Sequence, residues 1–260
     1  MNKLIMKDNE IITNNLSNKI TLEYTNGELI NSLNIKVLKS CNLYMLNTSK
    51  EDVKLNILFD ILPNVDFKLN VVKESGNYKI QTKYNLAENS KITVTKINDS
   101  DKIVEREVFF LVNNKSEVDY LLKTVSTNEE KYDISVHHKH ENTNSNIVMN
   151  GINILDGKLS LNVTTYIPKK IKNCIANQDS RIINLNDNKC VIRPNLLIDE
   201  FDCIANHSAL VGKFSDEEIF YLNKLGLSYE NSISLLTKGF LRSKLTDFKV
   251  IDKIIDKYWR

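Results

Sequence analysis

The sequence is short of proline and glycine and contains no long apolar run, and each shortage excludes something. Three prolines and seven glycines among 260 residues leave most segments without a residue that interrupts a strand. The most apolar stretch, 108–112, has the length of a strand, whereas a membrane-spanning helix needs about 18 apolar residues or more. No P-loop, glycine-rich dinucleotide motif, Gly-x-Ser-x-Gly elbow or HExxH pattern is present. We therefore expect a protein that is not an enzyme, binds no nucleotide and crosses no membrane.

An excess of charge of either sign is also missing. The 35 basic and 33 acidic residues leave a formal net charge of +2, and the lysines are scattered along the sequence. Net charge therefore gives no reason to expect a nucleic acid or an acidic membrane as a partner. The N-terminal stretch MNKLIMKDNEII contains Asp8 and Glu10 and does not read as a secretory signal. Four cysteines without a CxxC pair predict reduced thiols in a cytoplasmic protein.

Short strands dominate the sequence before residue 215. Apolar and polar residues alternate with period two, and β-branched residues are frequent, most clearly in 91–95, 133–136 and 158–164. This pattern fits a sandwich, a barrel or a β-helix, and periodicity alone does not separate the three. Asn and Gly, which tolerate the positive φ of tight corners, mark the predicted turns. These turns are Asn26-Gly27, Ser75-Gly76-Asn77, Asn150-Gly151, Asp156-Gly157 and Asn186-Asp187-Asn188.

Helical signals replace the strand pattern from Ser215 onward. Ser215 and Glu218 fit a capping box, and the acidic residues that follow Ser215 favour the positive end of a helix dipole. Gly226 is placed to end this first helix, and Ser228 precedes a second one. A third helix is predicted from about residue 246 to 258, where apolar residues recur at helical spacing.

The stretch from 198 to 240 contains a series of short motifs in a fixed order. They are His207-Ser208-Ala209, Gly212, Asp216-Glu217-Glu218, Phe220-Tyr221-Leu222, Lys224-Leu225-Gly226-Leu227-Ser228 and Gly239-Phe240. In this order they resemble the C-terminal signature of the SufB/SufD family of iron–sulfur cluster assembly proteins. The resemblance is dense from about residue 178 to 240, looser back to about 120, and general before that.

The resemblance implies a mainly β fold, a right-handed parallel β-helix with a C-terminal α-helical domain. On this basis residues 1–30 are an N-terminal segment, 31–212 the β-helix core and 213–260 the helical domain. A solenoid needs its ends covered, because a terminal turn exposes unpaired strand edges. We expect the helices after Ser215 to provide such a cap.

The function implied by the resemblance is that of a scaffold subunit in iron–sulfur cluster assembly. In the family an ABC-type ATPase, SufC, docks on the helical region, and a large apolar group there can anchor such an interface. The expected anchors are Phe220, Tyr221 and Phe240. A SufB/SufD-like partner, or a second copy of this chain, is expected to bind the β-helix. The alternatives are a structural adaptor without metal chemistry and a carbohydrate-active β-helix, although the latter needs grouped carboxylates that the sequence does not show.

His207 is the first candidate for a metal ligand, because neutral imidazole binds transition metals. The resemblance places it where two subunits meet and a nascent cluster forms, with Cys203 as a weaker second candidate. The essential cysteine of SufB is replaced here by Gln178, and an amide cannot serve as a thiolate. The chain therefore looks more like SufD than SufB, and a transient cluster would have to be shared with a partner chain. Cys174 and Cys190 lie on either side of Gln178 and are left open as substitutes.

The run His137-His138-Lys139-His140 invites a second metal hypothesis. In a strand, His138 and His140 share one face and His137 points to the other. We interpret the run as a partly exposed polar strand rather than a zinc site. The resemblance supports a structural role at a corner of the β-helix.

Overall fold

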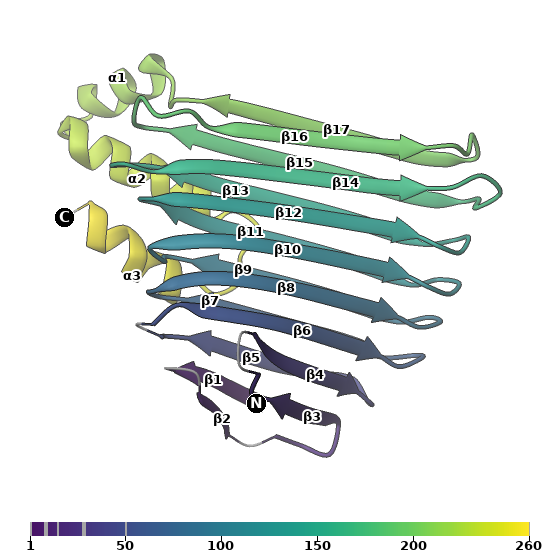
Figure 1. The fold of residues 1–260 in the computed structure, drawn as a ribbon. Coiled ribbons are helices and arrows are strands. Elements are labelled where there is room, and N and C mark those ends of the chain that lie inside the picture. Colours follow the sequence, from purple (N-terminus) through teal and green to yellow (C-terminus); the bar gives the residue numbers. More distant parts are fainter. Residues whose placement is uncertain (1, 8–9, 15, 28–29, 50, 260) are drawn as a thin grey trace.

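A computed structural model describes residues 2–7, 10–14, 16–27, 30–49 and 51–259. Within these residues the chain forms seventeen strands and three helices, and the strands make two sheets (Figure 1). Sheet A contains β1 (Asn2–Lys7), β2 (Glu10–Asn14), β5 (Cys41–Asn47), β7 (Asp66–Lys73), β9 (Lys91–Asn98), β11 (Glu117–Ser126), β13 (Asn144–Asn153), β15 (Cys174–Asn184) and β17 (Cys203–Gly212). Sheet B contains β3 (Ile20–Thr25), β4 (Asn31–Val37), β6 (Val53–Ile61), β8 (Asn77–Leu86), β10 (Lys102–Leu111), β12 (Glu129–His138), β14 (Lys158–Ile167) and β16 (Val191–Ile198).

From β4 onward, successive strands alternate between the two sheets, and neighbours within a sheet run parallel in continuous register. The result is a parallel β-solenoid of about seven turns. The predicted mainly β fold with C-terminal helices is therefore confirmed. Sandwich and barrel are excluded, because strands that follow one another in the sequence lie in opposite sheets and each pairs with the strand one turn away.

The period-two pattern separates an inner from an outer face of each sheet. In β8, for example, the burial alternates along the whole strand, and the buried residues face the opposite sheet. Phe59, Tyr84 and Phe109 occupy one register position on β6, β8 and β10, and their rings stack at 5.1 and 4.3 Å. Such ladders bury large apolar surfaces at matched positions in successive turns, which favours this register.

A charged network lies inside the middle turns of the solenoid. Glu105 binds Lys73 at 2.8 Å and Lys96 at 2.6 Å, and Lys96 also binds Glu107 at 2.8 Å. The hydroxyl of Tyr120 donates to Glu107 at 2.5 Å. Burial would raise the pKa of Glu105, but the ammonium groups of Lys73 and Lys96 outweigh burial and hold that pKa at about 2. The carboxylate of Glu105 is therefore paired and ionised inside the solenoid.

Asparagines form corners on one side of the solenoid, at positions other than the predicted turns. Asn64, Asn89 and Asn142 adopt positive φ values of 60°, 54° and 59°. Their side chains also connect successive turns, since the amide of Asn89 donates to Asn64 at 2.8 Å and that of Asn142 to Asn114 at 3.0 Å. Asn suits this place because it tolerates the left-handed region and hydrogen-bonds along the ladder.

One predicted turn is wrong. Asn150-Gly151 lies inside β13 rather than at a corner. Gly151 faces the interior, where an added Cβ would stand 2.2 Å from Cδ2 of Leu159. Close packing, rather than a turn, requires a glycine at this position. The sequence pattern alone cannot distinguish these two uses of glycine.

The three helices are α1 (Asp216–Lys224), α2 (Tyr229–Arg242) and α3 (Lys249–Tyr258). Ser215 and Glu218 form the predicted capping box, Ser228 caps α2, and Gly226 adopts φ +92° at the end of α1. The third helix begins three residues later than predicted. None of the helices described here is long and apolar enough to cross a membrane.

The expected helical cap is wrong in its position. Helices α2 and α3 pack against the outer face of sheet A, near the C-terminal ends of its strands (Figure 1). Ile251, Ile254 and Ile255 of α3 contact a row that includes Ile97 and Val125. This apolar row lies on the outer face of sheet A. The helices therefore cover the side of the solenoid and leave its last turn open.

Candidate functional site at the open last turn

The last turn of the solenoid consists of β16 and β17, and each has only one strand neighbour in the described part of the chain. Strand β16 pairs with β14, and β17 pairs with β15, so the other edge of both strands is unpaired. Most of β17 is exposed, including Ile204, Leu210 and Val211. Long exposed edges are sites where further strands can be added.

The first end of the solenoid differs. There β2 runs antiparallel to β1, and β3 runs antiparallel to β4, so the chain reverses its direction at both sheet edges. Strand β1, which lies in the segment expected to precede the core, continues sheet A by pairing in parallel with β5. The two ends are thus built differently, and only the C-terminal one continues the parallel register to its edge.

His207 lies on the inward-facing row of β17, directly opposite Gln178 of β15. The same row continues inward through Ile147 and Tyr120. The two positions that the family resemblance equates with the SufB histidine and cysteine are therefore neighbours in the ladder. His207 is exposed, because no further turn covers it.

Polar groups beneath His207 are only partly satisfied. Gln178 is 3% exposed, and its amide donates to Thr165 Oγ1 at 2.8 Å and to the carbonyl of Asn195 at 3.1 Å. Its Oε1 atom, and the hydroxyl of the 1% exposed Ser180, have no hydrogen-bond partner among the described residues. Thr165 and Ser180 were not identified from the sequence. In a strand with period-two alternation, the sequence does not show which inward-facing polar residue takes part in a site.

The thiols lie apart from this point. Cys203 and Cys174 are opposite one another at the starts of β17 and β15. Each is four residues from the His207–Gln178 pair, roughly 13 Å along an extended strand. Cys190 lies in the loop before β16 and packs against the core. Burial raises the pKa of Cys203 and of Cys190, which disfavours the thiolate. None of the three lies opposite Gln178 in the strand ladder.

The residues present do not form a closed metal site. Within the described ranges no group of three or more His, Cys, Asp or Glu residues could hold a metal ion. The His207–Gln178 pair supplies one imidazole and one amide, whereas iron–sulfur clusters are held mainly by thiolates. A cluster could be held here only if other ligands came from a second chain.

The histidine run is structural. His138 is buried, with its ring nitrogens 2.7 Å from Thr143 Oγ1 and 3.0 Å from Ser145 Oγ. Burial lowers the pKa of His138 to about 4, so the ring is neutral. His137 points to the outer face and stacks on Tyr166 at 4.4 Å, while His140 lies beyond the end of β12.

The three expected aromatic anchors differ in exposure. Phe220 and Tyr221 on α1 are 60% and 63% exposed, and no residue of α1 is buried. Phe240 on α2 is half-buried against the sheet A cluster, with the ammonium of Lys123 6.0 Å from its ring centroid. Phe220 and Tyr221 thus form a free apolar surface, and Phe240 is largely engaged within the chain.

Comparison with known sequences decides the family. A profile described as "SUF system FeS cluster assembly, SufBD core domain" matches residues 67–240. The chain belongs to the SufBD family. The matched part runs from β7 to α2 and includes the open last turn, so the site lies within the family's core domain.

SufBD proteins from several organisms are similar to this chain. An iron–sulfur cluster assembly SufBD family protein, ycf24 of Galdieria sulphuraria, is 25% identical over 185 residues, covering 67% of this chain and 81% of the relative. The SufBD family protein slr0074 of Synechocystis is 22% identical over 228 residues, covering 82% and 47%. PH1385 of Pyrococcus horikoshii is 40% identical over 65 residues, covering 23% and 14%. The matches therefore span less than half of the last two relatives. Membership in the SufBD family argues against the carbohydrate-active alternative.

Proposed function

We propose that this SufBD family protein is a non-catalytic, SufD-like scaffold subunit in iron–sulfur cluster assembly. It pairs with a SufB-like chain, or with a second copy of itself, through the open last turn. The observation that carries this proposal is the combination of free edges on β16 and β17 with unpaired polar atoms beneath them. A strand from a partner can add hydrogen bonds along the edge and cover the buried amide and hydroxyl.

His207 is proposed as this chain's contribution to a cluster site that the partner completes. It is the outermost residue of the inward row, so a second solenoid that abuts the last turn meets it first. Since the thiolate position holds Gln178, the thiolates must come from the partner. The cluster is cargo that is assembled and passed on, and this chain alone should bind iron poorly.

The helical region is proposed to recruit an ABC-type ATPase. Phe220 and Tyr221 project from α1, which packs on α2 and stands away from the solenoid core. Exposed aromatic side chains of this kind commonly dominate binding at protein interfaces. ATP hydrolysis then belongs to the partner, consistent with the absence of a P-loop from the sequence.

Reconstitution tests the role of His207. The full chain is co-expressed with a SufB-like protein and the ABC ATPase of the same organism, and iron and cluster absorbance are measured in the purified complex. His207→Ala should lower cluster content at least about twofold without loss of any subunit, because one of roughly four ligands is removed. The matched control is His137→Ala, which changes a histidine on the outer face of sheet B. Wild-type cluster content with His207→Ala would instead leave this chain as a structural adaptor.

Co-purification tests the ATPase surface. Tyr221→Asp places a charge in the centre of the exposed pair and should weaken recovery of the ATPase at least about tenfold, as for a hot-spot residue. Val112→Asp, at an exposed apolar residue on a corner of the solenoid, is the control. Equal recovery of the ATPase with both variants would contradict the assignment.

A further inference from the structure

The outer face of sheet B collects basic side chains that lie far apart in the sequence. Lysines stand near the start of five successive strands, namely Lys54, Lys79, Lys102, Lys131 and Lys158 on β6 to β14. Parallel strands are about 4.8 Å apart, so these ammonium groups form a zigzag row along the solenoid axis. Lys54, Lys79 and Lys131 share one register position, and Lys102 and Lys158 lie two residues earlier, on either side of Glu129. A net charge of +2 does not reveal this row, because it averages over all faces of the chain.

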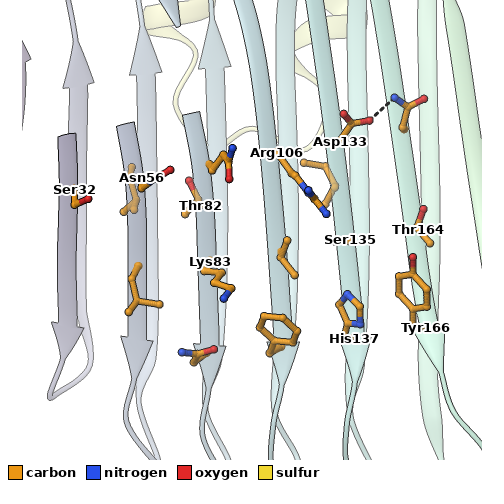
Figure 2. A pocket seen from close by; sticks show the side chains of 18 of the residues that line it. Ser32, Asn56, Thr82, Lys83, Arg106, Asp133, Ser135, His137, Thr164 and Tyr166 are labelled. Atoms are coloured by element: carbon orange, nitrogen blue, oxygen red, sulfur yellow. Dashed lines mark hydrogen bonds between the residues drawn. The ribbon is translucent and has the colours of Figure 1, made fainter. Parts of the chain in front are cut away.

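Two further basic groups lie in the middle of the same face. Lys83 on β8 and Arg106 on β10 point outward, and neither has a carboxylate partner in the part of the chain that the structure describes (Figure 2). Among the five lysines of the row, Lys102 pairs with Glu129 at 2.8 Å and Lys131 with Asp133 at 3.2 Å. The remaining members of the row have no ion pair within the described residues.

The outer face of sheet A has a different balance. There Lys91 binds Asp119 at 2.8 Å and Glu117 at 3.2 Å. Arg181 is two residues from Asp179 on the same face of β15. The helices cover part of this face, whereas no helix residue borders the hollow on sheet B. The excess of positive charge is therefore specific to one open surface.

This surface is also hollowed. A depression of about 920 Å³ crosses the strands from β4 to β14, and Lys83 and Arg106 are among the residues that line it (Figure 2). Side-chain amides of Asn56 and Gln81 line it without a hydrogen-bond partner among the described residues. One border is a ladder of rings, in which Phe110 lies 5.0 Å from His137 and His137 stacks on Tyr166. Charge, amide groups and aromatic rings thus occur together in one elongated groove.

From this arrangement we propose that the outer face of sheet B binds single-stranded nucleic acid. The row of lysines matches a phosphate backbone that runs along the solenoid axis, because it repeats positive charge at each turn. The amides offer both donors and acceptors to base edges, and the ring ladder provides an apolar border for the bases. A flat anionic membrane cannot enter the hollow. An acidic peptide would also match the basic groups, but its carboxylate side chains carry no flat ring to lie against the ring ladder, and its displacement of the oligonucleotide is an outcome of the test.

Fluorescence anisotropy with labelled oligo-dT and oligo-U of about 12 nucleotides tests the proposal on the full chain. Lys83→Glu/Arg106→Glu should weaken binding at least about tenfold, since two phosphate contacts become repulsive. Binding should also weaken with salt, with a logarithmic slope of about −3.5 for five contacts. The control is Lys68→Glu/Arg181→Glu on the outer face of sheet A, which should change affinity less than about twofold. Unchanged circular dichroism must accompany both variants.

Competition experiments distinguish the possible ligands of the outer face of sheet B. Poly-glutamate that displaces the oligonucleotide and binds with the same dependence on Lys83 and Arg106 would assign the face to an acidic protein segment and overturn the proposal. Duplex DNA that binds as tightly as the single strand would also overturn it, because the groove would then act only through charge. Asn56→Leu/Gln81→Leu should weaken single-strand binding but not heparin binding. These results are independent of cluster content and of ATPase recovery, so the proposed scaffold role can stand or fall separately.

Discussion

The middle turns and the last turn of this solenoid use buried polar groups in opposite ways. In the middle, Glu105 and Glu107 are satisfied within the chain by Lys73 and Lys96. At the last turn, Gln178 keeps an unpaired oxygen beneath an exposed edge strand. A buried ion network of this kind is costly to break, whereas an unpaired group at an open end can be satisfied by association.

This difference between the middle turns and the last turn predicts which residues stabilise the fold and which take part in association. The middle turns have neighbours on both sides, so every strand edge is paired and the core is continuous. The last turn has a neighbour on one side only, and its inward-facing residues are covered from one direction. Variants in the middle should therefore change unfolding, and variants at the last turn should change assembly.

Glu105→Gln should cause the largest change in stability. The substitution leaves Lys73 and Lys96 buried with one fewer carboxylate, and loss of one partner from a buried ion network costs about 3–5 kcal/mol. Urea unfolding followed by circular dichroism measures the effect. Glu117→Gln, which breaks a half-exposed pair with Lys91, is the control and should cost less than about 1 kcal/mol. Similar losses for both variants would show that the buried network does not stabilise the middle turns.

Glu130 should produce a pH-dependent effect of intermediate size. Burial raises the pKa of Glu130 to about 7, and hydrogen bonds from Thr124 and Tyr132 only partly oppose this rise. The folded protein therefore binds a proton that the unfolded chain releases between about pH 4.5 and 7. Stability must fall as pH rises through this window, by about 3 kcal/mol for this group.

The variant Glu130→Gln should remove this fall. His138 acts in the opposite direction, since its lowered pKa makes the folded state more stable as pH rises from about 4 to 6.5. The difference in unfolding free energy between wild type and variant, measured at each pH, isolates the glutamate. A difference that does not vary between pH 4.5 and 7 would mean that Glu130 is ionised in the folded state.

Much of the fold follows from local sequence chemistry. Alternating strands, four of the five Asn/Gly turns and the Ser215 capping box were predictable, because each depends on residues close in sequence. The solenoid itself was not, since period-two strands satisfy several β architectures and only the family resemblance distinguished them. The position of the helices was also missed, because the apolar row at Ile97 and Val125 is recognisable only once strands of different turns lie side by side.

The candidate site was predictable only in part. His207 and Gln178 were singled out from the sequence, and the register places them opposite one another. The basic face of sheet B was not foreseen, because Lys54 and Lys158 are about a hundred residues apart and become part of one row only through the parallel register. Spatial charge patterns need the strand order, which composition does not contain.

The smallest expected effect, and the sharpest test of the open end, concerns association. Leu197→Asp/Leu210→Asp places a charge on each edge strand at residues that are 52% and 46% exposed, so folding should change by less than about 1 kcal/mol. Association with the partner chain, measured by analytical ultracentrifugation, should weaken at least about tenfold, or about 1.4 kcal/mol. Ile12→Asp is the matched control, since it is 43% exposed on β2 at the first end, where the chain reverses direction. If Ile12→Asp weakened association as much as the double variant, the two ends would be equivalent, and the partner would not select the turn that carries His207.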